Sequence, residues 1–209
     1  MSDRIVRIIG LTGGIATGKT AISNYLADTY GWTILDADIY AREAVHPGSS
    51  ILNSIVEHYG PSILLSDGNL NRPELGNIIF CNPAERQWLE QQIHPYVRRR
   101  LIEATQSYIS RSSLVSTSTL TVVLVVPLLF EANMTDLCTE IWVVYCEPSV
   151  QLERLMQRDG LSCDRALACI QTQLPLAQKC QKADVVLDNS STLDSLFMQV
   201  NAIVSRFEI

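Results

Sequence analysis

The sequence predicts an α/β fold in which a five-stranded, mostly parallel sheet carries helices on both faces. Five apolar runs alternate along the 209-residue chain with segments whose apolar residues recur at helical spacing, a pattern typical of parallel sheets. The longer runs are continuous, as in strands buried on both faces. Hydrophobic residues make up 47% of the chain, which suffices for a sizeable core. The expected strands are 5–11, 33–35, 121–126, 141–146 and 185–187.

The first strand leads into a glycine-rich loop that matches the motif G-x-x-x-x-G-K-[ST], with Gly13, Gly18, Lys19 and Thr20 at the fixed positions. A strand before the loop and a helical pattern after it are the context that this motif needs. Backbone N–H groups of the loop and the N-terminus of the helix then bind phosphate. We expect Lys19 to reach the β- and γ-phosphates of ATP and the Thr20 hydroxyl to bind Mg²⁺. The candidate ATP-binding residues are Gly13, Gly14, Ile15, Ala16, Thr17, Gly18, Lys19, Thr20 and Ala21.

The second strand is followed by Asp36-Ala37-Asp38. One of these carboxylates has the chemistry to orient an attacking hydroxyl and accept its proton. The alternative is a helix cap, because Asp is a favoured N-cap residue, and both interpretations stay open. The third strand ends without the acid that holds the metal in many phosphate-loop enzymes. We therefore expect Asp36 or Asp38 to serve the Mg²⁺ shell through water.

A long insertion, 39–119, separates the second strand from the third. It contains helical patterns and turn signals such as Pro47-Gly48. An insertion after the carboxyl end of a strand is placed to overhang the ligand crevice of an α/β sheet, so we expect a substrate-binding subdomain. A Ser/Thr-rich surface loop is expected at 112–121. The nucleotide-binding core is then 1–38 with 120–150 and 183–209.

The segment 151–182 carries several basic residues and is the candidate lid. Arg154 and Arg158 are four positions apart on one face of an expected helix. A cationic segment that closes over ATP would stabilise charge on the transferring phosphoryl group. The alternative is an ordinary solvated helix face, with Glu153 and Asp159 as neighbours.

Composition argues against several other classes of protein. The net charge of −6 and the pI of about 5.0 disfavour a nucleic-acid binder, which usually has a basic excess. The most apolar stretch, 120–130, is too short to span a membrane, and no secretory leader pattern precedes the first strand. We expect a cytoplasmic protein with no membrane partner, as a monomer or small homo-oligomer. The cysteines lack C-x-x-C spacing, so zinc is not expected.

Taken together, these motifs resemble those of the dephospho-coenzyme A kinase family, over nearly the whole chain. They include G-L-T-G-G-I at 10–15, D-A-D-I at 36–39 and V-P-L-L-F-E at 126–131. The remaining matches are 18–20, Ala41, Arg42, 71–76, Ile79, Phe80, His94, Pro95, 157–159, Gln173, Lys179, 183–184 and 187–189.

The resemblance implies a P-loop kinase-like three-layer fold and a reaction. The ribose 3′-hydroxyl of dephospho-CoA attacks the γ-phosphate of ATP, giving CoA and ADP in the last step of coenzyme A synthesis. The implied catalytic residues are Asp38, Lys19, Arg154 and Arg158, with Arg158 and Lys179 also on ATP. The implied acceptor contacts are Asp38, Arg42, Arg72, His94 and Glu131. The candidate metal residues stay those expected from the motif and the acidic pair, Thr20 and, through water, Asp36. His94 stands before Pro95 at an expected helix start, where a histidine also simply caps or packs.

Three positions depart from the family pattern. Ala16 stands where the family loop usually has Gly, and we expect an αR or β conformation there because Ala tolerates positive φ poorly. Val125 replaces a common Asp, and Cys169 a common lid Arg. The nearest alternative function is a nucleoside monophosphate kinase. A GTPase is disfavoured because no N-K-x-D segment occurs, and a regulatory ATP-binding module because Lys19, Thr20 and Asp38 are all present.

Overall fold

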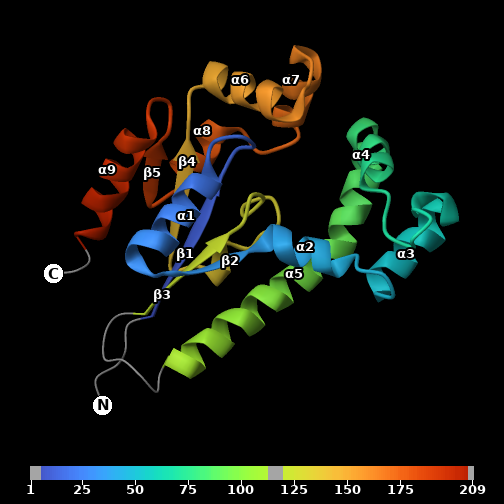
Figure 1. Ribbon diagram of the computed structural model, residues 1–209, viewed down its shortest axis with the longest axis horizontal. Coiled ribbons are helices and arrows are strands. Elements are labelled where there is room, and N and C mark those ends of the chain that lie inside the picture. The colour runs from blue at the N-terminus through green and yellow to red at the C-terminus, as the bar shows by residue number, and fades with distance from the viewer. Residues whose placement is uncertain (1–5, 113–119, 207–209) are drawn as a thin grey trace. The chain divides into compact units, whose positions relative to one another are not determined.

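Five strands form one sheet within residues 6–112 and 120–206, the part of the chain that the computed structural model describes (Figure 1). They are β1 (Val6–Gly13), β2 (Thr33–Asp36), β3 (Leu120–Val125), β4 (Glu140–Tyr145) and β5 (Val185–Asp188). Their order in the sheet is β2-β3-β1-β4-β5. All five predicted strands are confirmed, each to within two residues at either end. The sheet therefore has the number and sequence of strands that the apolar runs predicted.

β1 lies at the centre of the sheet and positions the glycine-rich loop. It pairs in parallel with β3 on one side and with β4 on the other, and β4 pairs in parallel with β5. Its last residue, Gly13, is in register with Val144 of β4. In parallel sheets of this kind, ligands bind beyond the carboxyl ends of the strands. The loop that follows Gly13 lies at that edge.

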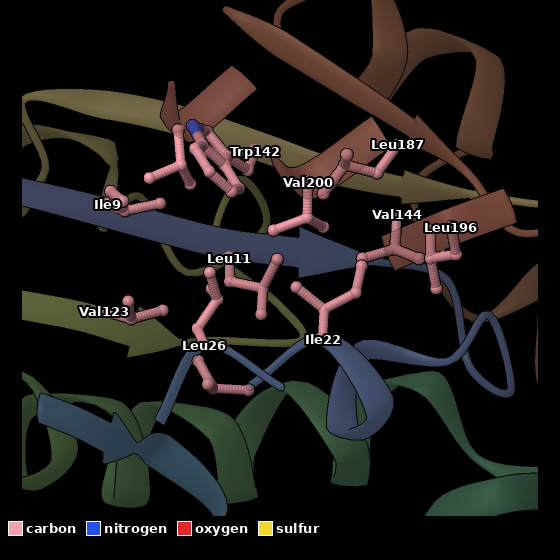
Figure 2. Close-up of a cluster of buried hydrophobic side chains, with 12 residues drawn as sticks. Ile9, Leu11, Ile22, Leu26, Val123, Trp142, Val144, Leu187, Leu196 and Val200 are labelled. Atoms are coloured by element: carbon pink, nitrogen blue, oxygen red, sulfur yellow. The ribbon is translucent and has the colours of Figure 1, made fainter. Parts of the chain in front are cut away.

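One face of the sheet packs against α1 (Lys19–Tyr30) and α9 (Leu193–Val204). Figure 2 shows this packing: side chains of alternate strand positions meet Ile22 and Leu26 from α1 and Leu196 and Val200 from α9. The strand residues in this cluster are at most 5% exposed: Ile9, Leu11, Val123, Val125, Trp142, Val144 and Leu187. The other strand positions, Val122, Leu124 and Val143, are at most 1% exposed. Both faces are thus covered, which explains the continuous apolar runs.

Three more helices lie between β4 and β5: α6 (Pro148–Asp159), α7 (Cys163–Gln171) and α8 (Leu176–Gln181). A short 3₁₀ helix, η2 (Thr135–Leu137), precedes β4. α6 starts with Pro148 in its first turn, where proline loses no helical hydrogen bond. Ser162 caps α7 and Thr192 caps α9, each with a side-chain oxygen on a backbone N–H group.

The chain divides into two compact units, and the boundaries differ from the predicted insertion. Unit 1 is Met1–Leu35 with Thr105–Ile209, and unit 2 is Asp36–Ala104. Unit 2 contains α2 (Ala37–Ala44), α3 (Ser50–Tyr59), η1 (Pro61–Ile63), α4 (Arg72–Cys81) and most of α5 (Pro83–Ser112). The segment 151–182 belongs to unit 1 and does not form a unit of its own. Most of the predicted loop at 112–121, residues 113–119, lies outside the described residues.

Unit 2 has a small apolar core of its own. Buried side chains from α3, α4, α5, η1 and the connecting segments form it: Val45, Leu52, Ile55, Ile63, Leu70, Leu75 and Leu89. None of the described helices combines the length and the apolar character that crossing a bilayer requires.

Candidate functional site

The glycine-rich loop has positive φ at three residues, Gly13 (154°), Ala16 (60°) and Gly18 (101°). The expectation of an αR or β conformation at Ala16 is therefore wrong. Thr17 donates its N–H to the carbonyl of Gly14 at 3.4 Å, which closes a four-residue turn with Ala16 at its third position. A type II turn requires positive φ at that position. This requirement also explains why glycine is usual there.

Gly18 is needed because the backbone passes very close to Asn189. A Cβ atom at this position would lie 2.2 Å from Asn189 Nδ2. Gly18 is also the N-cap residue of α1, and no side chain hydrogen-bonds the start of that helix. Helix N-termini without such a side-chain cap present N–H groups to a bound anion. The loop and α1 therefore provide a phosphate site of the kind that the motif predicts.

Lys19 folds back onto its own loop. Its ammonium donates to the carbonyl oxygen of Gly14 at 2.7 Å, and the Thr17 hydroxyl donates to the same oxygen at 2.9 Å. These bonds give the Gly14 carbonyl two side-chain donors and hold Lys19 at the loop. The contact of Lys19 with phosphate stays a prediction.

Two glutamines hold the polar groups of Ile15. The N–H of Ile15 donates to Gln173 Oε1 at 2.8 Å, and its carbonyl accepts from Gln151 Nε2 at 2.8 Å. Gln151 lies on α6 and is 4% exposed, while Gln173 lies between α7 and α8. The segment after β4 thus contacts the loop through hydrogen bonds.

Asn189 and Arg154 extend these contacts from the end of β5. Asn189 Nδ2 donates to the carbonyl of Thr17 at 2.8 Å, and Arg154 donates to the backbone carbonyl of Asn189 at 2.9 Å. Burial raises the pKa of the Cys146 thiol, while the nearby charges of Arg154 and Lys19 oppose this rise. The charges of Arg154 and Lys19 therefore both reach the thiol of Cys146, the residue directly after β4. Arg158, by contrast, forms two hydrogen bonds with its neighbour Asp159, at 2.7 and 2.8 Å.

Lys179 is completely buried under the loop. Its ammonium lies 2.8 Å from Glu131 Oε1, 3.1 Å from the carbonyl of Pro127 and 3.4 Å from the carbonyl of Gly13. Glu131 Oε1 also accepts the N–H of Leu174 at 2.9 Å. Buried charges are found where a partner and hydrogen bonds compensate the lost hydration. In this structure Lys179 contacts the first residue of the loop, and its contact with ATP stays a prediction.

Asp36 and Asp38 both lie at the start of unit 2. Asp36 is the last residue of β2 and the N-cap of α2, and its Oδ1 accepts the N–H of Asp38 at 2.8 Å. The capping interpretation is therefore confirmed for Asp36. Asp38 is exposed in the first turn of α2. Its carboxylate is accessible, as a group that receives a proton from a substrate must be.

The structure brings Arg42 and Arg72 together but separates His94 from a helix start. Arg72 begins α4, and its guanidinium approaches the backbone carbonyl of Arg42 at 3.5 Å. His94 lies well inside α5, next to Pro95. The expectation of a helix start there was wrong. Proline disfavours helical conformation in the residue before it, but here the helix continues through the pair.

A magnesium ion fits this site when phosphate oxygens provide most of its ligands. Among the described residues, no group of three or more His, Cys, Asp or Glu side chains is arranged to hold a metal. Thr20 is exposed in the first turn of α1, and Mg²⁺ accepts a hydroxyl oxygen beside phosphates and water. The donor set therefore suits a cation that arrives with a nucleotide.

Comparisons with known proteins agree with this geometry. The family model described as CoaE, dephospho-CoA kinase, matches residues 7–195. The chain belongs to the dephospho-CoA kinase family. A dephospho-CoA kinase from Trichormus variabilis is 57% identical over 203 residues, which cover 97% of this chain and 98% of that protein. Another, from Synechocystis, is 53% identical over 194 residues, 93% and 92% of the two chains.

Solved structures extend the dephospho-CoA kinase family likeness to the fold. The Thermus thermophilus protein TT1252 superposes with a TM-score of 0.74 at 29% identity, covering 97% of this chain and 98% of that one. A dephospho-CoA kinase from Campylobacter jejuni superposes with a TM-score of 0.69 at 24% identity, with the same coverage. The P-loop, α/β architecture is therefore shared along the whole chain.

Sequence reasoning missed the roles of Gln151, Gln173 and Asn189. Each contacts the loop from a distant part of the sequence, with separations of 136, 158 and 172 positions. Local periodicity carries no information about such contacts. One signal was available for Gln151: a glutamine four positions before Leu155 lies on the buried face of α6.

Proposed function

We propose that this chain transfers the γ-phosphate of ATP to the ribose 3′-hydroxyl of dephospho-CoA, giving CoA and ADP. One observation carries the proposal: the chain is similar along nearly its whole length to curated dephospho-CoA kinases. The intact phosphate loop and the buried contacts around it supply the phosphate-binding half of the reaction.

In the proposed reaction the 3′-oxygen attacks the γ-phosphorus in line with the leaving ADP. A new O–P bond forms, the bond from the γ-phosphorus to the β,γ-bridging oxygen breaks, and the proton of the hydroxyl passes to the carboxylate of Asp38. The backbone N–H groups of the loop bind the phosphates, and Lys19 stabilises the charge that develops on them. Mg²⁺, bound with ATP, neutralises phosphate charge.

The basic residues of α6 have different parts in this proposal. Arg154 is held near the loop through Asn189, so it is the better placed cation for the transferring group. Arg158 reaches ATP only if its side chain leaves Asp159. We propose that Arg158 exchanges Asp159 for phosphate when nucleotide binds.

The proposed acceptor contacts are Arg42, Arg72 and His94, together with Asp38. Arg42 and Arg72 are exposed in unit 2, and two guanidinium groups suit an anionic acceptor. Glu131, which the resemblance also places among these contacts, pairs with Lys179, so we propose for it a supporting role under the loop. Asp36 is proposed to reach the Mg²⁺ shell only through water, because its Oδ1 caps α2.

The test is ADP release by the purified chain with ATP and Mg²⁺, comparing dephospho-CoA, AMP, CMP, dTMP and no acceptor. Turnover confined to dephospho-CoA supports the proposal. Turnover with a nucleoside monophosphate contradicts it and assigns unit 2 to another acceptor. Size-exclusion chromatography with light scattering tests the prediction of a monomer or small homo-oligomer, and cell fractionation tests the predicted cytoplasmic location.

A further inference from the structure

The two glutamines on Ile15 hold both peptide planes that flank one Cα atom. The Ile15 N–H belongs to the peptide with Gly14 and bonds Gln173, whereas its carbonyl belongs to the peptide with Ala16 and bonds Gln151. Both bonds are 2.8 Å long. Fixing two successive peptide planes fixes φ and ψ of the residue between them.

This position matters because the left-handed residue follows directly. Ala16 has φ of 60°, a conformation that is unfavourable for an L-residue. A loop free to relax would leave it. In a phosphate cradle, N–H groups must converge on the anion while carbonyls point away, and a buried carbonyl turned away needs a donor of its own. Gln151 provides that donor for Ile15.

A carboxamide group is chemically suited to bind the Ile15 backbone beside a phosphate site. It combines a donor and an acceptor without charge, whereas a carboxylate would repel the phosphates close by. Gly14 makes room for it, because a Cβ atom on Gly14 would lie 2.4 Å from Gln151 Nε2.

We infer that Gln151 and Gln173 are positioning residues for ATP. They hold the Ile15 peptides so that the following N–H groups face the phosphates, and they couple nucleotide affinity to the segment between β4 and β5. The inference rests on the proposed function only in that the loop binds ATP, whichever acceptor is used.

The test replaces each glutamine by methionine, which has similar length but no hydrogen-bonding amide. ATP affinity is measured by calorimetry without acceptor, using a non-hydrolysable ATP analogue, and the KM values for ATP and dephospho-CoA are measured separately. Losing one buried hydrogen bond should weaken nucleotide binding and raise the ATP KM by about tenfold. The dephospho-CoA KM should change less than about twofold, because the proposed acceptor contacts belong to unit 2 and not to the loop.

Matched controls come from α6, which contains Gln151, and from α8, which follows Gln173. Gln157→Met removes an exposed glutamine of α6 that bonds only its neighbour Glu153 among the bonds described, and Gln178→Met removes an exposed one of α8. Both should bind the analogue like the wild type. If Gln151→Met and Gln173→Met also do so, or if both substrates are weakened alike, the inference is wrong.

Gly14→Ala provides an independent approach that keeps the glutamines. Its new Cβ displaces Gln151, so the affinity losses caused by Gly14→Ala and by Gln151→Met should not multiply. The double variant should bind the analogue about as tightly as Gly14→Ala alone. Multiplying effects would overturn the inference. If Gln151→Met does not fold, Gly14→Ala and Gln173→Met carry the same test. Because binding is measured without acceptor, a chain with a different acceptor still gives a result.

Discussion

Ala16 concentrates the backbone strain of the phosphate loop in one residue. Its φ of 60° is one of two positive values among the described residues other than glycine, the second being that of Asn133. Left-handed backbone at an L-residue costs about 1–2 kcal/mol, and surrounding contacts must impose it. Here they include the turn closed by Thr17 on the Gly14 carbonyl. The conformation of the loop therefore imposes the positive φ on whichever residue occupies position 16.

Ala16→Gly should stabilise the chain. Relief of about 1–2 kcal/mol of strain exceeds the extra entropy that glycine adds to the unfolded chain, about 0.4–1 kcal/mol. The melting temperature should rise by about 1–4 °C in calorimetry. The control is Ala21→Gly, in the first turn of α1 where glycine has no positive φ to relieve; it should lower the melting temperature. A fall for Ala16→Gly of the same size as for Ala21→Gly would contradict the argument.

Asp38→Asn should reduce turnover by about 10²–10⁴-fold, because an amide does not accept the hydroxyl proton. Nucleotide affinity should be nearly unchanged. The two effects are separated by single-turnover kinetics and by titration with the ATP analogue.

Asp36→Asn is the matched control for this substitution. Asn caps helices as well as Asp, so the α2 cap seen at Asp36 is kept while the same charge is lost. Unchanged Mg²⁺ dependence in Asp36→Asn removes Asp36 from the metal shell. Normal turnover in Asp38→Asn, together with a loss in Asp36→Asn, would transfer the role of base to Asp36.

At the scale of elements, α3 and α5 are joined by a small polar contact at the edge of the unit 2 core. Glu85 Oε2 accepts from Tyr59 at 2.8 Å and lies 2.8 Å from His58 Nε2, and the His58 ring stacks on Trp88 at 3.9 Å. The hydrogen bond from His58, and next that from Tyr59, lowers the pKa of Glu85 below its ordinary value. Burial is the main cause that raises the pKa of Tyr59, and its hydrogen bond with the Glu85 carboxylate raises it further.

Glu85→Gln should make unit 2 less sensitive to acid. Because the pKa of Glu85 is lowered in the folded chain, its contribution is present above the unfolded value of 4.5 and is lost as pH falls through the folded value. Between about pH 5 and pH 3, hydrogen exchange in α3 should therefore accelerate more in the wild type than in Glu85→Gln. Glu57→Gln, which removes an exposed charge from α3, should behave like the wild type. Equal acceleration in all three chains would exclude this role of Glu85.

Elements with a local signal were predictable, and those defined by distant contacts were not. The strands and α1 follow from continuous or periodic apolar residues, and the loop follows from its motif. Pro95 misled because its effect on the preceding residue is only a preference, so α5 continues past it. Lys179 was predicted in a lid, but its burial beside Glu131 depends on a residue 48 positions away, a partner that no local pattern indicates.

At the scale of the whole molecule, the two units divide the proposed substrates between them. The described contacts of the phosphate loop come from residues 12–19 and 127–189, all within unit 1. The proposed acceptor residues of α2, α4 and α5 belong to unit 2. Nucleotide and acceptor should therefore stabilise different parts of the chain.

Hydrogen exchange with ADP alone tests this division. At about 100 times its Kd, ADP should stabilise the chain that binds it by about 2.7 kcal/mol. The added protection should appear in the loop, α1 and the segment between β4 and β5, and not in α3 or α4. The comparison is dephospho-CoA alone, which should protect unit 2. Equal protection of α3 and α4 by ADP would contradict the division.

The long sequence separation of the loop contacts has a consequence for synthesis on the ribosome. The motif is translated before the side chains that hold it, which follow 136–172 positions later. Contacts so distant in sequence form only after most of the chain has emerged. A nascent or prematurely terminated chain carries the whole motif but not the groups that shape it. Such fragments should therefore bind ATP less tightly than the whole chain, although they carry every residue of the motif.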